Sequence, residues 1–184
     1  MNKYLVLNTA DMNVLKTNGR IFSAKNADVK HNGVLGQIGA LKEGEMELRD
    51  FVPATEETIR TQLPMICFAP EVNYDSSRFA NRLIGNFRYH ADLAFSVAPM
   101  TVADSIEVSQ DFIVGGEDLK VGAIIKQVVG GGLEKVEVAP TSDEAMAYFV
   151  VTGVRNASTY QQPFGTGIAA APAHKMYTIE LVLA

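Results

Sequence analysis

The chain has 184 residues, of which 47% are hydrophobic and 20% are charged, and its formal net charge is −5. This composition is typical of a folded globular protein, because disordered chains have fewer apolar side chains and a larger net charge. The 16 basic residues against 21 acidic ones argue against nucleic-acid binding, and the apolar runs are too short for a helix that spans a bilayer. The single cysteine, Cys67, excludes an intrachain disulfide and a cysteine-based zinc site.

Residues 1–35 have little periodicity and modest apolar content. Asparagines that include Asn8, Asn13 and Asn18 lie there among Thr, Ser, Lys and Gly. Such a segment is either a loop-rich β-meander or an extended arm that becomes ordered on a partner. We therefore divide the chain into an N-terminal arm or loop-rich segment at 1–35 and a β-rich globular domain at 36–184, with a subdivision near residue 60 left open.

Alternation of apolar and polar residues with period two predicts half-buried strands along the chain. These stretches are 45–49, 92–97, 105–109, 133–138 and 176–183, and β-branched apolar runs at 121–129 and 149–154 predict further strands. The glycines at 130–132 predict a hairpin loop, because glycine adopts positive φ readily. Closely spaced turn signals in the second half of the chain favour an antiparallel barrel or sandwich.

Helix signals are few. Thr55 precedes acidic residues that suit the first turn of a helix over 55–60, and 75–84 carries Phe79 and Leu83 at helical spacing. Thr141 and Glu144 have the spacing of a capping box. The sequence thus predicts a mainly β fold, an antiparallel β-barrel or sandwich with one to three short helices and an extended N-terminal arm.

Residues that could carry chemistry are isolated from one another in the sequence. The histidines His31, His90 and His174 lie too far apart for a local metal motif, and Cys67 lies in an apolar stretch between two prolines, which favours a buried, inert thiol. The stretch 165–170 resembles a dinucleotide fingerprint, but Pro172 interrupts the helix that must follow it. We therefore expect no catalytic residue, no cofactor and no metal, and a protein that is not an enzyme.

A long, uncharged segment at 158–172 is rich in small residues, and loops of that length are often functional. Together with the N-terminal arm, it is our candidate for partner contacts. The residues singled out for this role are Asn8, Asn13 and Asn18 in the arm and Tyr160 and Phe164 in the loop.

Two short motifs follow an apolar strand pattern between Pro64 and Val97. The first contains Pro70, Glu71, Val72, Tyr74 and Asp75, and the second contains Arg88, His90, Asp92, Phe95, Ser96 and Val97. The pattern resembles small structural proteins of tailed bacteriophages, the capsid decoration or head cement proteins. The resemblance covers about residues 64–130 and the last strand.

The resemblance implies structural roles for these residues. Pro70 and Tyr74, followed by Asp75, would form a turn with an aromatic anchor, and Arg88 would pair with Asp92 across a strand. We expect His90 to lie at a strand edge and to hydrogen-bond a carbonyl group.

The resemblance also implies a function: a structural virion protein that binds the outer surface of a phage capsid and stabilises the shell. Its partner would be the major capsid protein, with a homo-oligomer left open, and neither nucleic acid nor membrane is expected as a partner. The first residues lack the apolar stretch of a signal peptide, so we expect assembly in the host cytoplasm and a final place on the virion. The alternatives are a tail-tube, connector or fibre-base protein and a small-molecule-binding β-barrel.

Overall fold

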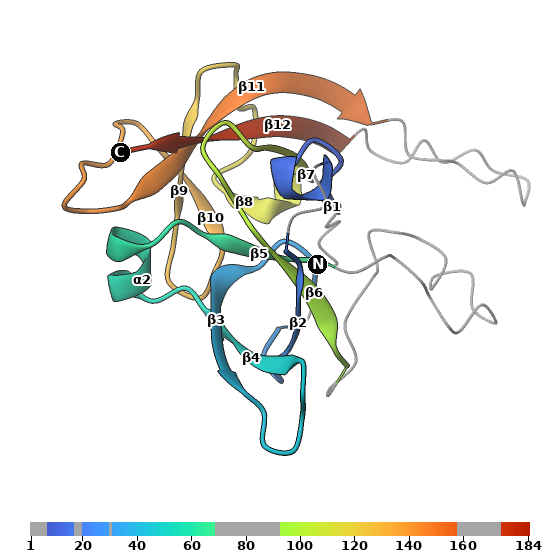
Figure 1. The fold of residues 1–184 in the computed structure, drawn as a ribbon. Coiled ribbons are helices and arrows are strands. Elements are labelled where there is room, and N and C mark those ends of the chain that lie inside the picture. Colours follow the sequence, from blue (N-terminus) through green and yellow to red (C-terminus); the bar gives the residue numbers. More distant parts are fainter. Residues whose placement is uncertain (1–6, 17–19, 30, 69–92, 158–173) are drawn as a thin grey trace, which may run out of the picture.

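The computed structural model describes residues 7–16, 20–29, 31–68, 93–157 and 174–184 of the chain. These residues form a closed barrel and an open sheet, which lie in the lower and upper halves of Figure 1. The described helical segments are short: α1 (Asn13–Lys16), α2 (Glu56–Thr61) and the 3₁₀ turn η3 (Gln110–Phe112). The predicted fold class, a mainly β barrel or sandwich with a few short helices, is confirmed.

The barrel closes five strands in the order β2-β4-β3-β5-β6, with β6 paired back to β2. They are β2 (Phe22–Lys25), β3 (Leu35–Leu41), β4 (Leu48–Pro53), β5 (Met65–Phe68) and β6 (Phe95–Pro99). Neighbouring strands run antiparallel except β2 and β4, which run parallel. Closure pairs every barrel strand on both sides.

The open sheet has seven strands in the order β1-β7-β12-β11-β9-β10-β8. They are β1 (Leu7–Asn8), β7 (Ser105–Ser109), β8 (Ile113–Val114), β9 (Ile124–Gln127), β10 (Leu133–Val136), β11 (Ala147–Ala157) and β12 (His174–Leu183). The long antiparallel pair β11 and β12 holds the centre, with one β-bulge between Val151 and Gly153. Both β9 and β7 attach to this pair, so the sheet is organised around it.

Two apolar clusters fill the fold. The cluster inside the barrel contains Ala24, Val29, Val34, Phe51, Cys67, Phe95 and Val97. The second cluster joins residues of the barrel strands, such as Leu35 and Ile66, to residues of the open sheet, such as Phe149, Tyr177 and Ile179. The barrel and the sheet are therefore parts of one packed body. Cys67 is fully buried, as predicted.

The predicted helix near residue 55 is confirmed and is capped as expected. The Thr55 hydroxyl accepts a hydrogen bond from the Thr58 N–H at 3.3 Å, and the Thr55 N–H donates to the Thr58 hydroxyl at 2.8 Å. Glu56 and Glu57 lie in the first turn, where acidic side chains interact favourably with the positive end of the helix dipole.

The prediction of a helix at Thr141 is wrong. The Thr141 N–H does donate to the Glu144 carboxylate at 3.1 Å, which is half of a capping box. However, the chain forms only a turn there, because the Met146 N–H donates to the carbonyl oxygen of Ile59 at 2.8 Å and leads the chain into β11. The predicted helix at 75–84 lies outside the described residues.

The expectation of an extended N-terminal arm is corrected for the described part of residues 1–35. β1 pairs with β7 in the open sheet, and β2 is a barrel strand. Between them, Met12 is fully buried and Val14 is 8% exposed, so α1 contributes to the shared core. The loop-rich β alternative describes these residues, because most of their apolar side chains are used in packing, with Ile21, which is 45% exposed, as an exception.

The glycine loop between β9 and β10 packs against the barrel. The Leu35 N–H donates to the Gly131 carbonyl oxygen at 2.9 Å, and the Gly130 N–H donates to the Ala54 carbonyl oxygen at 2.8 Å. Gly131 has φ +81°, and a Cβ at this position would overlap the carbonyl oxygen of Leu35. Gly130 has φ +88° but has open space around its Cα. The loop thus requires glycine for two different reasons.

These two glycines give a matched test of the contact between the loop and β3. We expect Gly130→Ala to lower the free energy of unfolding by about 1 kcal/mol, the cost of positive φ alone. Gly131→Ala adds a backbone overlap and should cost about 3 kcal/mol or more. Urea unfolding followed by circular dichroism measures both, and equal losses would contradict the close approach of loop and barrel.

Candidate functional site

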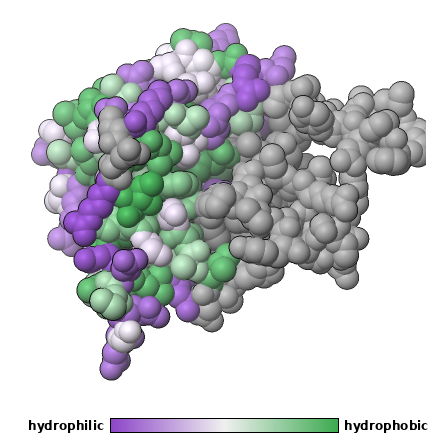
Figure 2. Space-filling model, turned by 45° about the vertical axis from the view of Figure 1, so that its right-hand side comes forward, coloured by the Kyte–Doolittle hydropathy of each residue, from purple (hydrophilic) through white to green (hydrophobic). Residues whose placement is uncertain are grey.

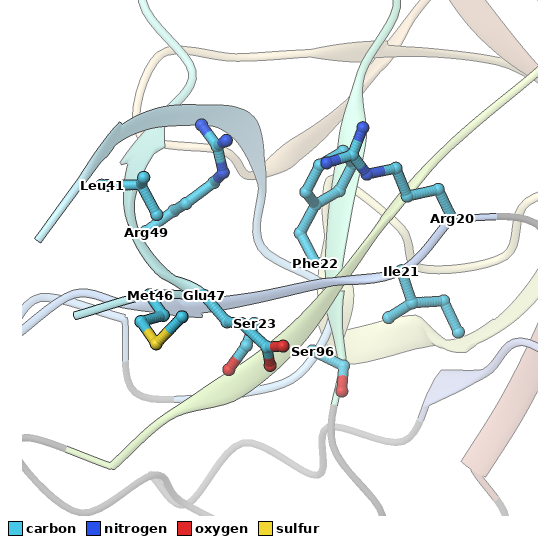
Figure 3. Close-up of a pocket in the computed structure, with 9 residues that line it drawn as sticks. All are labelled: Arg20, Ile21, Phe22, Ser23, Leu41, Met46, Glu47, Arg49 and Ser96. Carbon is cyan, nitrogen blue, oxygen red and sulfur yellow. The ribbon is translucent and has the colours of Figure 1, made fainter.

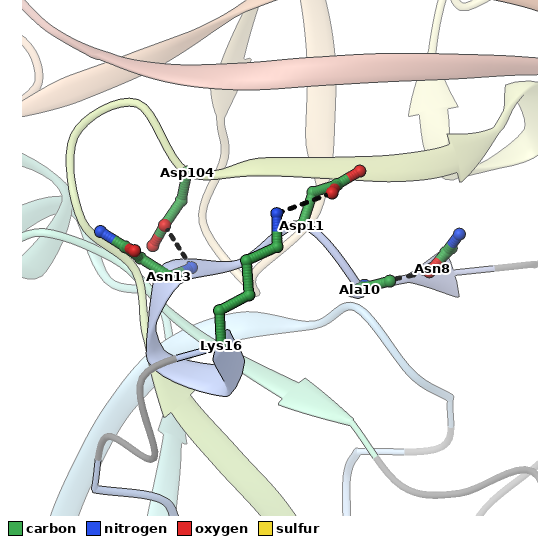
Figure 4. Close-up of polar contacts among 6 residues, drawn as sticks. All are labelled: Asn8, Ala10, Asp11, Asn13, Lys16 and Asp104. Atoms are coloured by element: carbon green, nitrogen blue, oxygen red, sulfur yellow. Dashed lines mark hydrogen bonds and ion pairs between the residues drawn. The ribbon is translucent and has the colours of Figure 1, made fainter.

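The residues predicted to contact a partner fall largely outside the described chain. Asn18, Tyr160 and Phe164 lie there, as do the motif residues Pro70, Tyr74, Asp75, Arg88, His90 and Asp92. Asn8 and Asn13 are described and exposed. Their polar contacts are drawn in Figure 4.

Asn13 begins α1, and its backbone is held by a buried carboxylate. The Asn13 N–H donates to Asp104 Oδ1 at 2.7 Å. Asp104 is 1% exposed, and its Oδ2 accepts from the N–H and hydroxyl of Thr101 at 2.6 and 2.9 Å. These bonds tie α1 to the turn between β6 and β7, so Asn13 has a structural role through its backbone.

Asn8 belongs to a polar network on the outer face of the open sheet. Its Oδ1 accepts from the Ala10 N–H at 3.0 Å, and its side chain also hydrogen-bonds Glu107 on β7. Glu107 receives both Nε and Nη2 of Arg155, the latter at 2.8 Å. The network therefore connects β1, β7 and β11, with β12 between the last two.

The network changes the ionisation of its members. The hydrogen bond from Arg155 holds the pKa of Glu107 below its ordinary value, although partial burial of the carboxyl acts in the opposite direction. The same bond raises the pKa of Arg155. On the exposed surface, Lys175 lowers the pKa of Asp118 in a second pair.

A groove at one end of the barrel is a stronger candidate for a binding site, and we call it the Arg–Phe groove (Figure 3). It has a volume of about 470 Å³. Its lining residues come from β2 and the two residues before it, from the β3–β4 hairpin and from β6: Arg20, Ile21, Phe22, Ser23, Leu41, Met46, Glu47, Arg49 and Ser96.

The arginines of this groove are arranged around one aromatic ring. The guanidinium carbon of Arg20 lies 4.8 Å from the centroid of Phe22, and that of Arg49 lies 6.0 Å from it. Phe22 packs against the barrel core, which fixes the ring. Cations over an aromatic face are attracted by its quadrupole, so the ring orients both guanidiniums.

The barrel pairing explains why these side chains meet. Parallel pairing of β2 with β4 places Ala24 beside Arg49, and antiparallel pairing of β2 with β6 places Ser23 beside Ser96. Phe22 and Ala24 face the barrel interior, so Ser23 between them faces outward. Residues far apart in the sequence thus form one surface.

Apolar side chains flank the arginines. Met46 is 92% exposed at the β3–β4 turn, and Leu41 and Ile21 are 47% and 45% exposed. Figure 2 shows apolar and hydrophilic side chains next to each other in the lower, barrel half of the molecule. Arg, Met and aromatic residues are enriched in protein interfaces, so this surface has the composition of a contact site.

Neither arginine of the groove forms an ion pair with a carboxylate of the described residues. The nearby Asp50 is engaged by Lys42 at 2.5 Å, and Arg49 makes one 3.4 Å hydrogen bond to the Gly39 carbonyl oxygen. The groove therefore presents two oriented guanidiniums, with Glu47 as its one lining carboxylate. Such planar donors bind carboxylates and other oxyanions.

A second groove, of about 710 Å³, lies between α2 and the β9–β10 hairpin. Its valines include Val129 and Val138, which are 60% and 78% exposed. Charges of both signs line it, among them Glu56, Arg60 and Lys126. This mixture indicates no particular ligand chemistry.

Chemical sites of other kinds are not found in the described ranges. No three His, Cys, Asp or Glu residues gather there as metal ligands, and no helix there is long and apolar enough to span a membrane. His31 packs edge-on against Phe112, with 5.8 Å between the ring centroids.

Comparison with known proteins gives no relative: no family model, no curated protein and no solved structure matches the chain.

The Glu107–Arg155 pair predicts a specific pH dependence of stability. Because the folded-state pKa of Glu107 lies below its ordinary value of 4.5, the carboxylate stabilises the fold above that pH, and the contribution is lost as the pH falls through the folded pKa. Glu107→Gln should lower the free energy of unfolding by about 1 kcal/mol at neutral pH. Its loss of stability on acidification should be shallower than that of the wild type.

Urea unfolding at a series of pH values measures this difference. Asp118→Asn is the control, because its pair with Lys175 is at the exposed surface and Asn tolerates the positive φ of this position. We expect Asp118→Asn to leave stability nearly unchanged. Parallel pH profiles for Glu107→Gln and the wild type would contradict the proposed role of the pair.

The buried carboxylate of Asp104 predicts a larger effect. Asp104→Asn replaces one of two acceptor oxygens by a donor that faces N–H and O–H groups, so it should lower the free energy of unfolding by about 2 kcal/mol. Asp143→Asn in an exposed turn is the matched control and should change little. Equal stabilities of the two variants in urea unfolding would show that Asp104 does not hold α1.

Proposed function

We propose that the chain is a structural virion protein that binds the outer surface of a bacteriophage capsid and stabilises the shell. Two lines of support are available. The segment 64–97 resembles capsid decoration proteins, and its two described ends, β5 and β6, are paired antiparallel strands of the barrel. The barrel also carries the Arg–Phe groove.

The observation that carries the proposal is the composition of the Arg–Phe groove. It combines Phe22, two arginines and a methionine that is 92% exposed. Side chains of these types supply much of the binding energy in protein interfaces when a partner removes them from water. The groove also belongs to a closed barrel, which is a rigid support for a contact surface.

The stabilising effect would follow from mass action. A protein that binds the assembled shell, but not the dissociated subunits, shifts the equilibrium toward the shell. A shell offers many equivalent sites, so modest contact energies repeated over many copies add up. The proposed partner is the major capsid protein, and the proposed location is the capsid surface.

The small-molecule alternative receives less support from the barrel. Phe51 and Phe95 pack edge-to-face inside it with 5.6 Å between ring centroids, and both are at most 3% exposed. Val97 and Cys67 are fully buried beside them. The described interior is filled by side chains, so a ligand would have to bind outside it.

Co-sedimentation with capsids that lack the protein tests the proposal. Purified full-length chain should bind assembled shells saturably, at a fixed copy number per shell, in a density gradient. Met46→Asp places a charge on the exposed apolar rim of the groove and should weaken binding about tenfold or more. Val121→Asp, at a 65% exposed position beside the open sheet, is the control and should bind as the wild type does.

Three outcomes would count against the proposal or its contact surface. Absence of binding to shells rejects a decoration role, and a discrete ring in negative-stain images would instead support the tail-tube or connector alternative. Equal binding of Met46→Asp and the wild type would reject the groove as the contact surface.

A further inference from the structure

We propose that the Arg–Phe groove binds an acidic segment of a protein partner, with a carboxylate held between Arg20 and Arg49 and apolar side chains against the rim. This inference names the chemistry of the partner for the same groove and rests on its proposed role in docking. It does not require the partner to be a capsid.

The charges of the groove are the first argument. The chain as a whole is acidic, with a net charge of −5, and yet two guanidiniums lie over one ring here without a carboxylate partner among the described residues. Arg20 is exposed, and its described contact is the Phe22 ring. A carboxylate supplied by a partner would complete this arrangement.

Preorganisation is the second argument. Arginine side chains normally lose rotamer freedom when they bind, which weakens the interaction. Here Phe22 holds both guanidiniums before binding, and Arg49 is also held by its bond to the Gly39 carbonyl oxygen. The planar guanidinium matches a carboxylate with two parallel hydrogen bonds, which lysine cannot do.

The groove is also polarised, which restricts where the carboxylate lies. In Figure 3, Arg20, Phe22 and Arg49 point to one side, whereas Ser23, Glu47 and Ser96 point to the other. Glu47 repels a second carboxylate, so the acidic group is directed to the arginine side. The neighbouring serine hydroxyls can hydrogen-bond the backbone of a bound segment.

The apolar rim distinguishes a protein segment from a free anion or a nucleic acid. Leu41, Met46 and Ile21 are each at least 45% exposed and form area that only apolar side chains of a partner would remove from water. A phosphate would leave this area exposed, and Glu47 opposes a polyanion. The expected ligand is thus an acidic residue flanked by apolar ones.

Fluorescence anisotropy with a labelled decapeptide tests this directly. The peptide carries Glu residues flanked by Leu in a Gly–Ser background, and the matched peptide has Gln in place of every Glu. The full-length chain should bind the Glu peptide, with an affinity that falls as salt is added, and should bind the Gln peptide about tenfold more weakly or worse.

The variants separate the groove from general charge effects. Arg20→Gln and Arg49→Gln should each weaken binding of the Glu peptide about tenfold. Arg60→Gln removes the same charge from exposed α2 beside the second groove and should leave binding within about twofold of the wild type. Thermal unfolding of all three variants checks that each keeps the fold. If Arg49→Gln unfolds, Arg20→Gln alone still tests whether the groove binds the Glu peptide.

Equal binding of the Glu and Gln peptides, or full binding by Arg20→Gln, would overturn the inference. Displacement of the Glu peptide by an equal concentration of inorganic phosphate would also overturn it in favour of a general anion site. Peptide binding without shell binding rejects the decoration role and keeps this inference. If Arg20→Gln binds shells at wild-type affinity and the Glu peptide does not bind, the decoration role is kept and this inference is rejected.

Discussion

In three strands of the barrel, adjacent residues pack into two different apolar cores, one inside the barrel and one shared with the open sheet. This burial on both faces of a strand joins the two halves of the molecule. In β5, Ile66 packs toward the open sheet and Cys67 points into the barrel. In β6, Ala98 packs toward the open sheet and Val97 points into the barrel. Val34 and Leu35 repeat the division where β3 begins. A strand buried on both faces must be apolar at consecutive positions, and neighbouring backbones must approach closely. The Gly131 loop meets this second demand, because its carbonyl oxygen accepts the N–H of Leu35 at a distance that leaves no room for a side chain.

The same constraint decides how much of the fold the sequence could reveal. β12 buries one face, so Ile179 and Leu181 alternate with Thr178 and Glu180 and the strand was predictable from its period. The stretch around Cys67 is apolar without alternation, which indicates burial but not which strands it joins. β1 and β2 are too short to show any period, and α1 is a single turn whose first N–H is held by Asp104 from a distant part of the chain. The sequence therefore left an arm and a loop-rich β segment both open for residues 1–35, because the apolar residues of the described part are placed by tertiary contacts.

The candidate site was beyond sequence reasoning for a related reason. Arg20 and Arg49 meet at Phe22 only because β2 and β4 run parallel within the closed barrel, and parallel neighbours leave no local signature between them. Asn8 was predicted to contact a partner because residues 1–35 are rich in asparagine. In the structure it supports a hydrogen-bond network across the open sheet, with Glu107 and Arg155 as the charged members. The alternation at 45–49 was wrongly read as a half-buried strand: β4 begins only at Leu48, and Met46 is 92% exposed in the turn before it. A long apolar side chain between two acidic residues was the one signal of this surface in the sequence.

The order of the strands along the chain has a consequence for biosynthesis. All barrel strands lie between residues 22 and 99, so every barrel partner exists once residue 99 has left the ribosome. The open sheet cannot be completed then, because its central strand β12 begins at His174 and β7 pairs with it. A barrel that closes early therefore presents Leu35, Ile66 and Met100 to water until β12 arrives. In the interval between these two events, the barrel's share of the common core has no partner from β11 and β12, so this apolar surface is exposed to water during synthesis.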